Sequence, residues 1–291
     1  MVSQILKETC PRPFLKWAGG KGRLIQQYQG YFPDHYETYY EPFLGGGAVF
    51  FHLQPQRAVL NDINAELINT YCCVRDHVEE LIILLKNHQE RHTKEYYYDI
   101  RGYSGGSILE QSARFIYLNK TCFNGLYRVN SQGKFNVPLG RYKNPGICQE
   151  DVLRMASKAL SGVKIAQADF TQVLDYATSD NDFVFFDPPY YPVSTTSYFT
   201  AYSRYCFDES QQIKLKDVFE KLVARGVKVM LCNSDCSFIR NLYHDFYIYD
   251  ISAARSINSN GKNRGKIGEV LVSSHKRLPN KKISPIYEGR G

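Results

Sequence analysis

The sequence has few of the features that mark secreted, zinc-binding or membrane proteins. None of its eight cysteines is spaced as a C-x-x-C pair or flanked by histidines, which argues against a zinc site. The first residues lack the apolar core of a signal peptide, and no apolar run is long enough to span a membrane. We therefore expect a soluble cytoplasmic protein with reduced thiols and no bound metal.

Acidic residues are missing from two long stretches, although the chain carries 29 Asp and Glu against 36 Lys and Arg. None stands between Glu110 and Glu150, and none between Ile251 and Gly268. A solvated basic face explains either stretch alone, but two of them in one chain favour a polyanionic partner. The second stretch supplies the candidate phosphate contacts Asn260, Lys262 and Arg264.

A nucleotide-triphosphate loop is also absent. The segment Gly19-Gly20-Lys21-Gly22 follows large apolar residues that include Trp17, but its spacing differs from G-x-x-x-x-G-K-[ST]. Glycines let a ligand approach the backbone closely, and a lysine among them can meet an anion. We expect Lys21 to anchor a carboxylate.

The stretch 39–51 predicts a short strand, a glycine turn and an apolar helix, and a second short strand then ends at Asn61-Asp62. In doubly wound α/β sheets a nucleoside-containing ligand lies at such a junction, where an acid can bind a ribose diol. A glycine triplet alone is equally typical of a tight turn. The candidate cofactor-binding residues here are Glu41, Phe43, Gly45, Gly47 and Asp62.

Helical periodicity recurs over 64–92, 108–118, about 149–160 and 209–225. The acid-free stretch between the second and third of these helices mixes bases, amides and aromatics, which suits reading base edges and gripping phosphates. Asn124-Gly125 and Gln132-Gly133 predict one or two hairpins there. An irregular surface loop would not explain the missing acids. The candidate nucleic-acid contacts include Phe123, Asn124, Arg128, Arg141 and Tyr142.

Further strands are predicted at 163–166, 183–186, 227–232, 247–251 and 269–273. Asp169-Phe170 follows the first of these, and the pair could hold the adenine of a bound nucleoside. The polar and aromatic stretch 195–207 is a candidate lid. Residues 276–291 are basic and poor in apolar side chains, so we expect a disordered tail.

The stretch Phe183–Phe186 is apolar without alternation, which predicts a central strand buried on both faces. Asp187 and Pro188-Pro189 follow, and the prolines hold the chain extended and leave carbonyl groups without local partners. The Asp187 carboxylate and the Pro188 carbonyl can each accept one hydrogen of an exocyclic amino group, while Tyr190 stacks on its ring. The same residues also suit an ordinary strand-ending turn.

Five motifs together, in this order and over almost the whole chain, resemble the Dam family of DNA adenine-N6 methyltransferases. They are PFLKWAGGK, EPFLGGGAVF, NGLYRVNSQGKFNVPLGRYK, DPPY and RSINSNG. The resemblance implies an α/β fold, namely a Rossmann-like sheet dependent on S-adenosylmethionine with an inserted helical and hairpin DNA-recognition domain. It also implies double-stranded GATC as the target. We expect catalytic parts at 14–65 and 163–275, the recognition insertion at 66–162, a tail at 276–291, and a monomer.

The resemblance also assigns roles to individual positions. The residues lining the cofactor site would be Trp17, Lys21, Asp62 and Asp187, with Gly45 and Gly47 in its loop. The residues facing the bases would be Lys16, Phe123, Asn124, Leu126, Arg128 and Pro138, with Tyr142 on a phosphate. Relatives often have tyrosine where Phe123 stands, so we expect stacking or wedging there but no hydroxyl contact.

Adenine N6 is a poor nucleophile and is unreachable while its base is stacked, so this chemistry requires the base to be flipped out. Asp187, Pro188 and Tyr190 would then form the catalytic pocket. Three alternatives share the same features: methylation of cytosine N4, methylation of RNA, and a catalytically idle DNA-binding relative. Whether the enzyme accompanies a nuclease is a matter of neighbouring genes.

Overall fold

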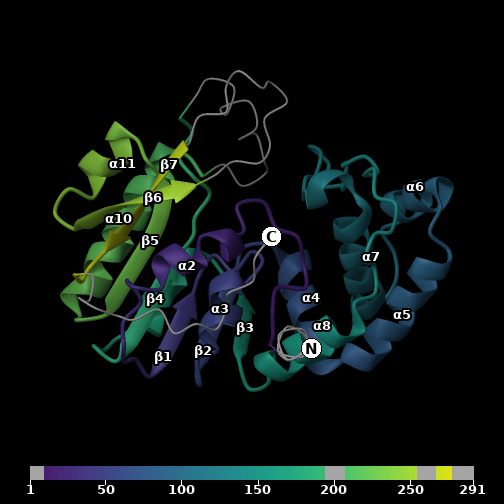
Figure 1. Cartoon of the computed structure of the whole chain (residues 1–291), viewed down its shortest axis with the longest axis horizontal. Coiled ribbons are helices and arrows are strands. Elements are labelled where there is room, and N and C mark those ends of the chain that lie inside the picture. Colours follow the sequence, from purple (N-terminus) through teal and green to yellow (C-terminus); the bar gives the residue numbers. More distant parts are fainter. Residues whose placement is uncertain (1–9, 194–206, 254–266, 277–291) are drawn as a thin grey trace.

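The computed structural model describes residues 10–193, 207–253 and 267–276. Nearly all of the candidate lid and of the predicted tail lies outside these ranges, as do Asn260, Lys262 and Arg264. Within them the chain folds around one seven-stranded mixed sheet flanked by helices (Figure 1). The predicted α/β class is therefore confirmed.

The sheet has the order β3-β2-β1-β4-β5-β7-β6, in which β1 to β5 are parallel to one another and β7 is antiparallel to both β5 and β6. All seven predicted strands form. Their bounds are β1 Thr38–Glu41, β2 Ala58–Asp62, β3 Lys164–Gln167, β4 Asp182–Phe186, β5 Lys228–Ser234, β6 Tyr247–Ala253 and β7 Ile267–Ser273.

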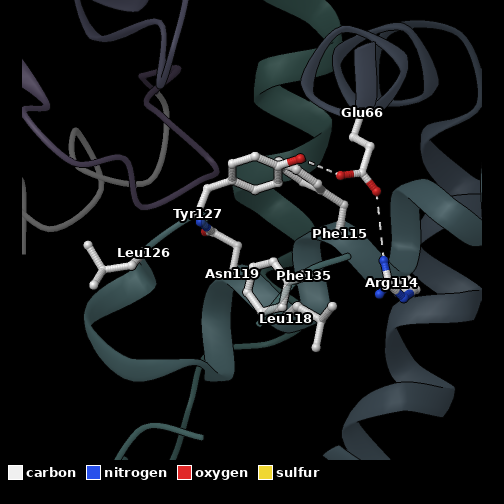
Figure 2. Close-up of a pocket in the computed structure, with 8 residues that line it drawn as sticks. All are labelled: Glu66, Arg114, Phe115, Leu118, Asn119, Leu126, Tyr127 and Phe135. Carbon is white, nitrogen blue, oxygen red and sulfur yellow. Dashed lines mark hydrogen bonds and ion pairs between the residues drawn. The ribbon is translucent and has the colours of Figure 1, made fainter. Parts of the chain in front are cut away.

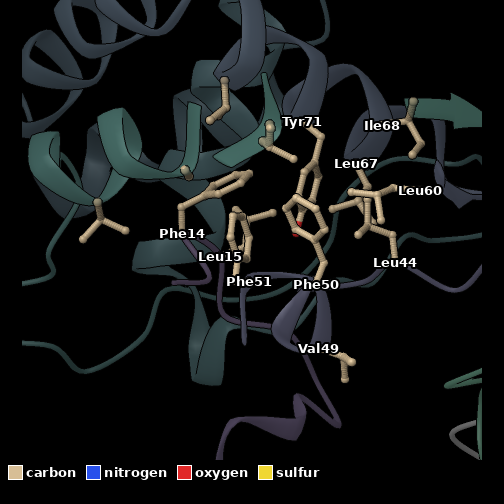
Figure 3. Close-up of a cluster of buried hydrophobic side chains, with 14 of the residues drawn as sticks. Phe14, Leu15, Leu44, Val49, Phe50, Phe51, Leu60, Leu67, Ile68 and Tyr71 are labelled. Atoms are coloured by element: carbon tan, nitrogen blue, oxygen red, sulfur yellow. The ribbon is translucent and has the colours of Figure 1, made fainter. Parts of the chain in front are cut away.

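Strand β4 lies at the centre of the sheet, and its side chains enter a separate core on each face. Phe183 and Phe185 belong to one apolar cluster, whereas Val184 and Phe186 belong to the other, and all four are fully buried. This explains why the strand sequence does not alternate between apolar and polar residues. Figure 3 shows part of the first cluster, where Phe14, Phe50 and Tyr71 pack together.

The helices divide between the sheet faces and a layer beyond its β3 edge (Figure 1). Helices α2 and α3 contribute to the first cluster, and α10 and α11 to the second. Helix α4 packs on β2 and β3 and also on α7 and α8, so it joins the sheet to the outer helices. The helix bounds are α2 Ile25–Tyr28, α3 Ala48–Leu53, α4 Ala65–Asp76, α5 Val78–Glu90, α6 Lys94–Gly102, α7 Ile108–Thr121, α8 Glu150–Leu160, α10 Glu209–Ala224 and α11 Ser237–Leu242.

The sheet reverses its strand order beside β1. From β1 the chain adds β2 and β3 on one side, and it later adds β4 and β5 on the other. The carboxyl ends of β1, β2 and β4 therefore meet at one edge of the sheet, and a crevice at such a switch point is where open α/β sheets bind their ligands. Glu41, Asp62 and Asp187 lie at these three strand ends.

In the outer region one predicted helix is wrong in detail and one helix was not predicted. The helix predicted over 64–92 is broken at His77, whose backbone angles (φ −137°, ψ 40°) end α4 and begin α5. The break lets the two helices take different directions, so that α4 reaches the sheet while α5 packs on α7 and α8. Helix α6 was not predicted, because its hydrophobic stripe is reduced to the single buried residue Tyr97.

The predicted turns form, but only one closes a hairpin. Val129 pairs with Phe135 in an antiparallel bridge, and Gly133 (φ +75°) lies in the turn between them. Asn124 (φ +55°) and Gly125 (φ +63°) also form a tight turn, yet the chain does not pair across it, because Cys122 before the turn pairs with the distant Leu139. The Asn-Gly pair therefore correctly predicted a turn with left-handed backbone angles, but it did not predict which segment the chain pairs with.

Candidate active site

An ion pair occupies the edge of the sheet beyond β4. Lys21 Nζ lies 2.8 Å from Asp187 Oδ1, donates to the Gly19 carbonyl at 2.9 Å and sits 4.5 Å from the centre of the Tyr190 ring. Lys21 is 3% exposed and the Asp187 side chain 22% exposed. Burial lowers the pKa of Lys21, but the acidic groups around it, with Asp187 contributing most, together outweigh burial and the pKa is raised. The pair was not predicted from the sequence.

A second carboxylate fixes the aromatic ring of the site. Glu269 on β7 accepts hydrogen bonds through Oε2 from the hydroxyls of Tyr190, at 2.9 Å, and Tyr28, at 3.3 Å. Burial raises the pKa of Tyr190 well above its usual range, so its phenol stays neutral. Sequence reasoning missed Glu269, although an acid at the start of the apolar strand Val270–Val272 is a usable signal.

Polar residues on neighbouring elements hold the segment after β4 in place. Asn233 Oδ1 accepts from the Tyr191 N–H at 3.0 Å, and Ser234 donates to the Tyr191 carbonyl at 2.5 Å. The Pro189 carbonyl accepts from Gln212 Nε2 at 3.0 Å. In the described part of the chain nothing donates to the Pro188 carbonyl, so this oxygen keeps its acceptor capacity.

Asp62 holds the glycine loop that follows β1. Its two carboxylate oxygens accept from the N–H groups of Gly45, at 3.1 Å, and Asn64, at 3.0 Å. Gly45 has φ +46°, and a Cβ there would lie 2.7 Å from Cδ1 of Trp17. Glycine is therefore required twice over, by its backbone conformation and by the indole ring. Trp17, Gly45 and Asp62 are thus brought together as expected.

Glu41 lies beneath this loop and is 3% exposed. Its Oε2 accepts from the Tyr39 hydroxyl at 2.8 Å and from the Phe50 N–H, in the first turn of α3, at 3.1 Å. Burial raises the pKa of Glu41 to about 8. These contacts make Glu41 a support for the loop and α3, and a direct contact with a cofactor remains a prediction.

The remaining predicted cofactor residues line the neighbouring part of the same edge. Phe43 stacks on Phe170 with ring centres 5.4 Å apart and an interplanar angle of 23°. Phe170 is buried, whereas Phe43 is half-buried. Asp169 accepts from the N–H and hydroxyl of Thr171 and lies 3.6 Å from Lys214 Nζ. The two rings and one carboxylate form a surface suited to a flat heterocycle.

The predicted DNA contacts lie together on the surface of the region between α7 and α8. Arg128 donates to Asn136, with its Nε 2.7 Å from Oδ1, so its guanidinium is oriented before any ligand binds. Lys16 stands over the ring of Tyr142 at 3.8 Å. The exposed members of the predicted set are Phe123, Asn124, Leu126, Arg128, Pro138, Arg141 and Tyr142.

Two negative findings concern the described residues alone. No group of three or more His, Cys, Asp or Glu side chains in the ranges 10–193, 207–253 and 267–276 is placed to hold a metal ion. Over the same ranges no helix combines the length and apolar character needed to cross a membrane.

Comparison with known proteins identifies the family. The model of the D12 class N6 adenine-specific DNA methyltransferases matches residues 17–257. The type II methyltransferase M1.LlaDCHI of Lactococcus lactis subsp. cremoris is 46% identical over 272 residues, which cover 91% of this chain and 95% of that protein. The type II methyltransferase M.MjaIII of Methanocaldococcus jannaschii is 41% identical, with 91% and 99% covered. The DNA adenine methylase of Escherichia coli K12 is 36% identical, with 90% and 94% covered. The chain belongs to the D12 class of N6 adenine-specific DNA methyltransferases.

Proposed function

We propose that this enzyme methylates N6 of adenine in double-stranded GATC, using S-adenosyl-L-methionine as the methyl donor and flipping the target base out of the duplex. The observation that carries the proposal is the acceptor pair at the end of β4. The Asp187 carboxylate is held by Lys21, and the neighbouring Pro188 carbonyl has no donor within the described residues. The ammonium of Lys21 that holds Asp187 also lies 4.5 Å from the centre of the Tyr190 ring, whose hydroxyl donates to Glu269.

The residues along the sheet edge fit the proposed cofactor. Asp62 uses one lone pair of each oxygen on the backbone and keeps others for a ribose diol. The stacked Phe43 and Phe170 suit the adenine ring, and the close approach of Gly45 to Trp17 shows that side chains are excluded from the loop. The cofactor supplies an activated methyl group.

The chain's own residues would prepare the amino group for attack. When Asp187 and Pro188 accept its two hydrogens, the nitrogen lone pair points away from both acceptors, towards the methyl donor. Positive charge develops on N6 during the transfer. Among the described residues the surrounding cluster combines the carboxyl groups of Asp187 and Glu269 with the ammonium of Lys21, and the Asp187 carboxylate that accepts from N6 would stabilise the developing positive charge.

The segment 66–162 is proposed as the DNA-recognition insertion. Its exposed side chains between α7 and α8 combine an oriented guanidinium, amides and aromatic rings with a complete lack of acids from 111 to 149. An arginine fork suits a guanine edge, and an exposed ring at Phe123 suits the gap left by an extruded base. The resemblance of 124–143 to the Dam recognition stretch supports GATC as the sequence read.

Digestion of treated DNA tests this function directly. Unmethylated plasmid is incubated with the pure protein and S-adenosylmethionine, then cut with a nuclease that methylated GATC blocks. Protection together with N6-methyladenine in the nucleoside digest supports the proposal. N4-methylcytosine instead would favour the cytosine alternative, and methylation of added RNA alone would favour the RNA one. Asp187→Ala should lose activity while retaining DNA binding, and full activity in that variant would remove the mechanism.

A further inference from the structure

Two consecutive residues, Lys16 and Trp17, connect the two proposed ligand sites. Trp17 lies so close to the glycine loop that a side chain at Gly45 would overlap its indole. Lys16 lies equally close to the tight turn of the recognition region, because a Cβ at Gly125 would overlap the Lys16 side chain. A shift of this dipeptide would therefore disturb both the loop and the turn.

A buried amide holds the backbone of Lys16. Asn119, in the last turn of α7, accepts from the Lys16 N–H at 2.8 Å and donates to the Lys16 carbonyl at 2.6 Å. The same Nδ2 donates to the Gly125 carbonyl at 3.2 Å. Asn119 is only 4% exposed, so these bonds form away from water, and losing them would leave buried polar groups unpaired.

Aromatic rings from the outer region hold the indole. Trp17 stacks against Tyr127, with ring centres 5.9 Å apart, and against Phe115, at 6.4 Å. The Tyr127 hydroxyl donates to Glu66 Oε2 at 2.5 Å, and Figure 2 shows Glu66 standing between Tyr127 and Arg114. The cavity among the residues drawn measures about 10 Å³, the space of one water, so this is a packed joint and not a ligand pocket.

We infer that Asn119 and Tyr127 are positioning residues that couple cofactor binding to DNA binding through the Lys16-Trp17 dipeptide. The inference rests on the proposed function and on the roles that the resemblance to the Dam family assigns, with Trp17 at the cofactor and Lys16 at the bases. Both ligands then require one placement of the same dipeptide. Because Asn119 and Tyr127 hold the dipeptide rigidly, a shift that one ligand imposes at its own site is passed to the other site, so both ligands favour the same placement and each binds more tightly when the other is present.

The experiment uses the full-length enzyme, S-adenosylhomocysteine as a non-reactive probe and a short GATC duplex. Trp17 is the only tryptophan of the chain, so its emission reports on the joint directly. The duplex alone should change that emission. It should also tighten S-adenosylhomocysteine binding by about fivefold or more, and the probe should tighten duplex binding by the same factor, because such coupling is reciprocal.

Variants identify which contacts carry the coupling. Tyr127→Leu removes the stacked ring and should bring the coupling factor close to one, whereas Tyr127→Phe keeps the ring and should retain part of it. Asn119→Leu should also reduce the factor. The matched control is Tyr97→Phe, which loses a buried phenol bond to the Val137 carbonyl in the same region without touching the dipeptide.

The outcomes separate this inference from the proposed function. Tyr127→Leu and Asn119→Leu proteins that unfold cooperatively but keep the wild-type coupling factor would overturn the inference, and so would an equal loss in Tyr97→Phe. A wild-type enzyme that methylates GATC while its ligands bind independently would leave the function standing and remove the coupling. A wild-type enzyme that binds neither probe would remove both.

Discussion

The Tyr190 hydroxyl lies 2.9 Å from Glu269 Oε2, which links the ring that we propose stacks on the target base to a strand that sequence analysis did not connect with the site. Glu269→Gln keeps an acceptor for the phenol but removes one negative charge, and Glu269→Ala removes both. We expect the single-turnover rate to fall about tenfold in the first variant, equivalent to about 1.4 kcal/mol, and further in the second.

Tyr28→Phe is the control for this prediction, because it removes the other donor to Glu269 and leaves the Tyr190 bond intact. A duplex with 2-aminopurine at the target position adds a fluorescence readout of the extruded base. Equal rates in wild type and Glu269→Ala would show that the ring needs no anchor.

Lys21 should set the pH at which the enzyme becomes active. Burial raises the pKa of Asp187 and the Lys21 charge opposes that rise. Removing the charge in Lys21→Met therefore raises the pKa of Asp187 further, so the acid limb of kcat should move to higher pH. Lys21→Arg keeps the charge and should leave the limb nearer its wild-type position. Single-turnover rates at saturating S-adenosylmethionine from pH 5 to 9 measure the shift, and an unmoved limb would contradict it.

Glu41 should make folding stability depend on pH. Burial raises the pKa of Glu41 to about 8, whereas in the unfolded chain the pKa of a glutamate is about 4.3. At a pH between these two pKa values, Glu41 takes up a proton when the chain folds. The free energy of unfolding therefore falls as the pH rises from the lower pKa to the higher one, and it levels off above the higher one. Glu41→Gln can accept the same two bonds without titrating, and its urea-derived stability should fall less between pH 5.5 and 8.5. Parallel curves for the two proteins would rule out the buried proton.

Arg128 should contribute sequence preference and not merely affinity. Arg128→Ala should weaken binding to GATC by about 1–3 kcal/mol and bring it closer to binding of altered sites. Arg141→Ala, another exposed arginine of the same surface, should weaken all duplexes alike and reduce the salt dependence by about one phosphate contact. Competition binding on GATC and single-base variants measures both effects. A uniform loss in Arg128→Ala would reassign that residue to the phosphates.

Much of the sheet could be predicted from the sequence because the residues that indicate each strand lie next to one another in the chain. Phe183–Phe186 is apolar without alternation since both faces are buried, and Asp187 with two prolines marks where the strand must stop. The glycine loop could be predicted for the same reason, since Gly45 and Gly47 adopt the positive φ angles that glycine favours.

The missed features depend on residues distant in sequence. Nothing at His77 signals a helix end, and the break follows from where α4 and α5 pack. In the sequence Asn119 looks like an ordinary polar residue near a helix end. In the structure it forms two hydrogen bonds with the backbone of Lys16, which lies 103 residues away in the chain. Glu269 reaches Tyr190 only because β7 inserts beside β5, an order that strand patterns do not reveal.

The position of β4 has a consequence for how the enzyme should fail on heating. Asp187 and Tyr190 continue directly from a strand with parallel neighbours on both sides and a core on each face. Amide hydrogens of such a strand exchange only when the whole domain opens. The proposed catalytic groups therefore follow a strand that we expect to be well protected, and thermal inactivation should coincide with global unfolding instead of preceding it.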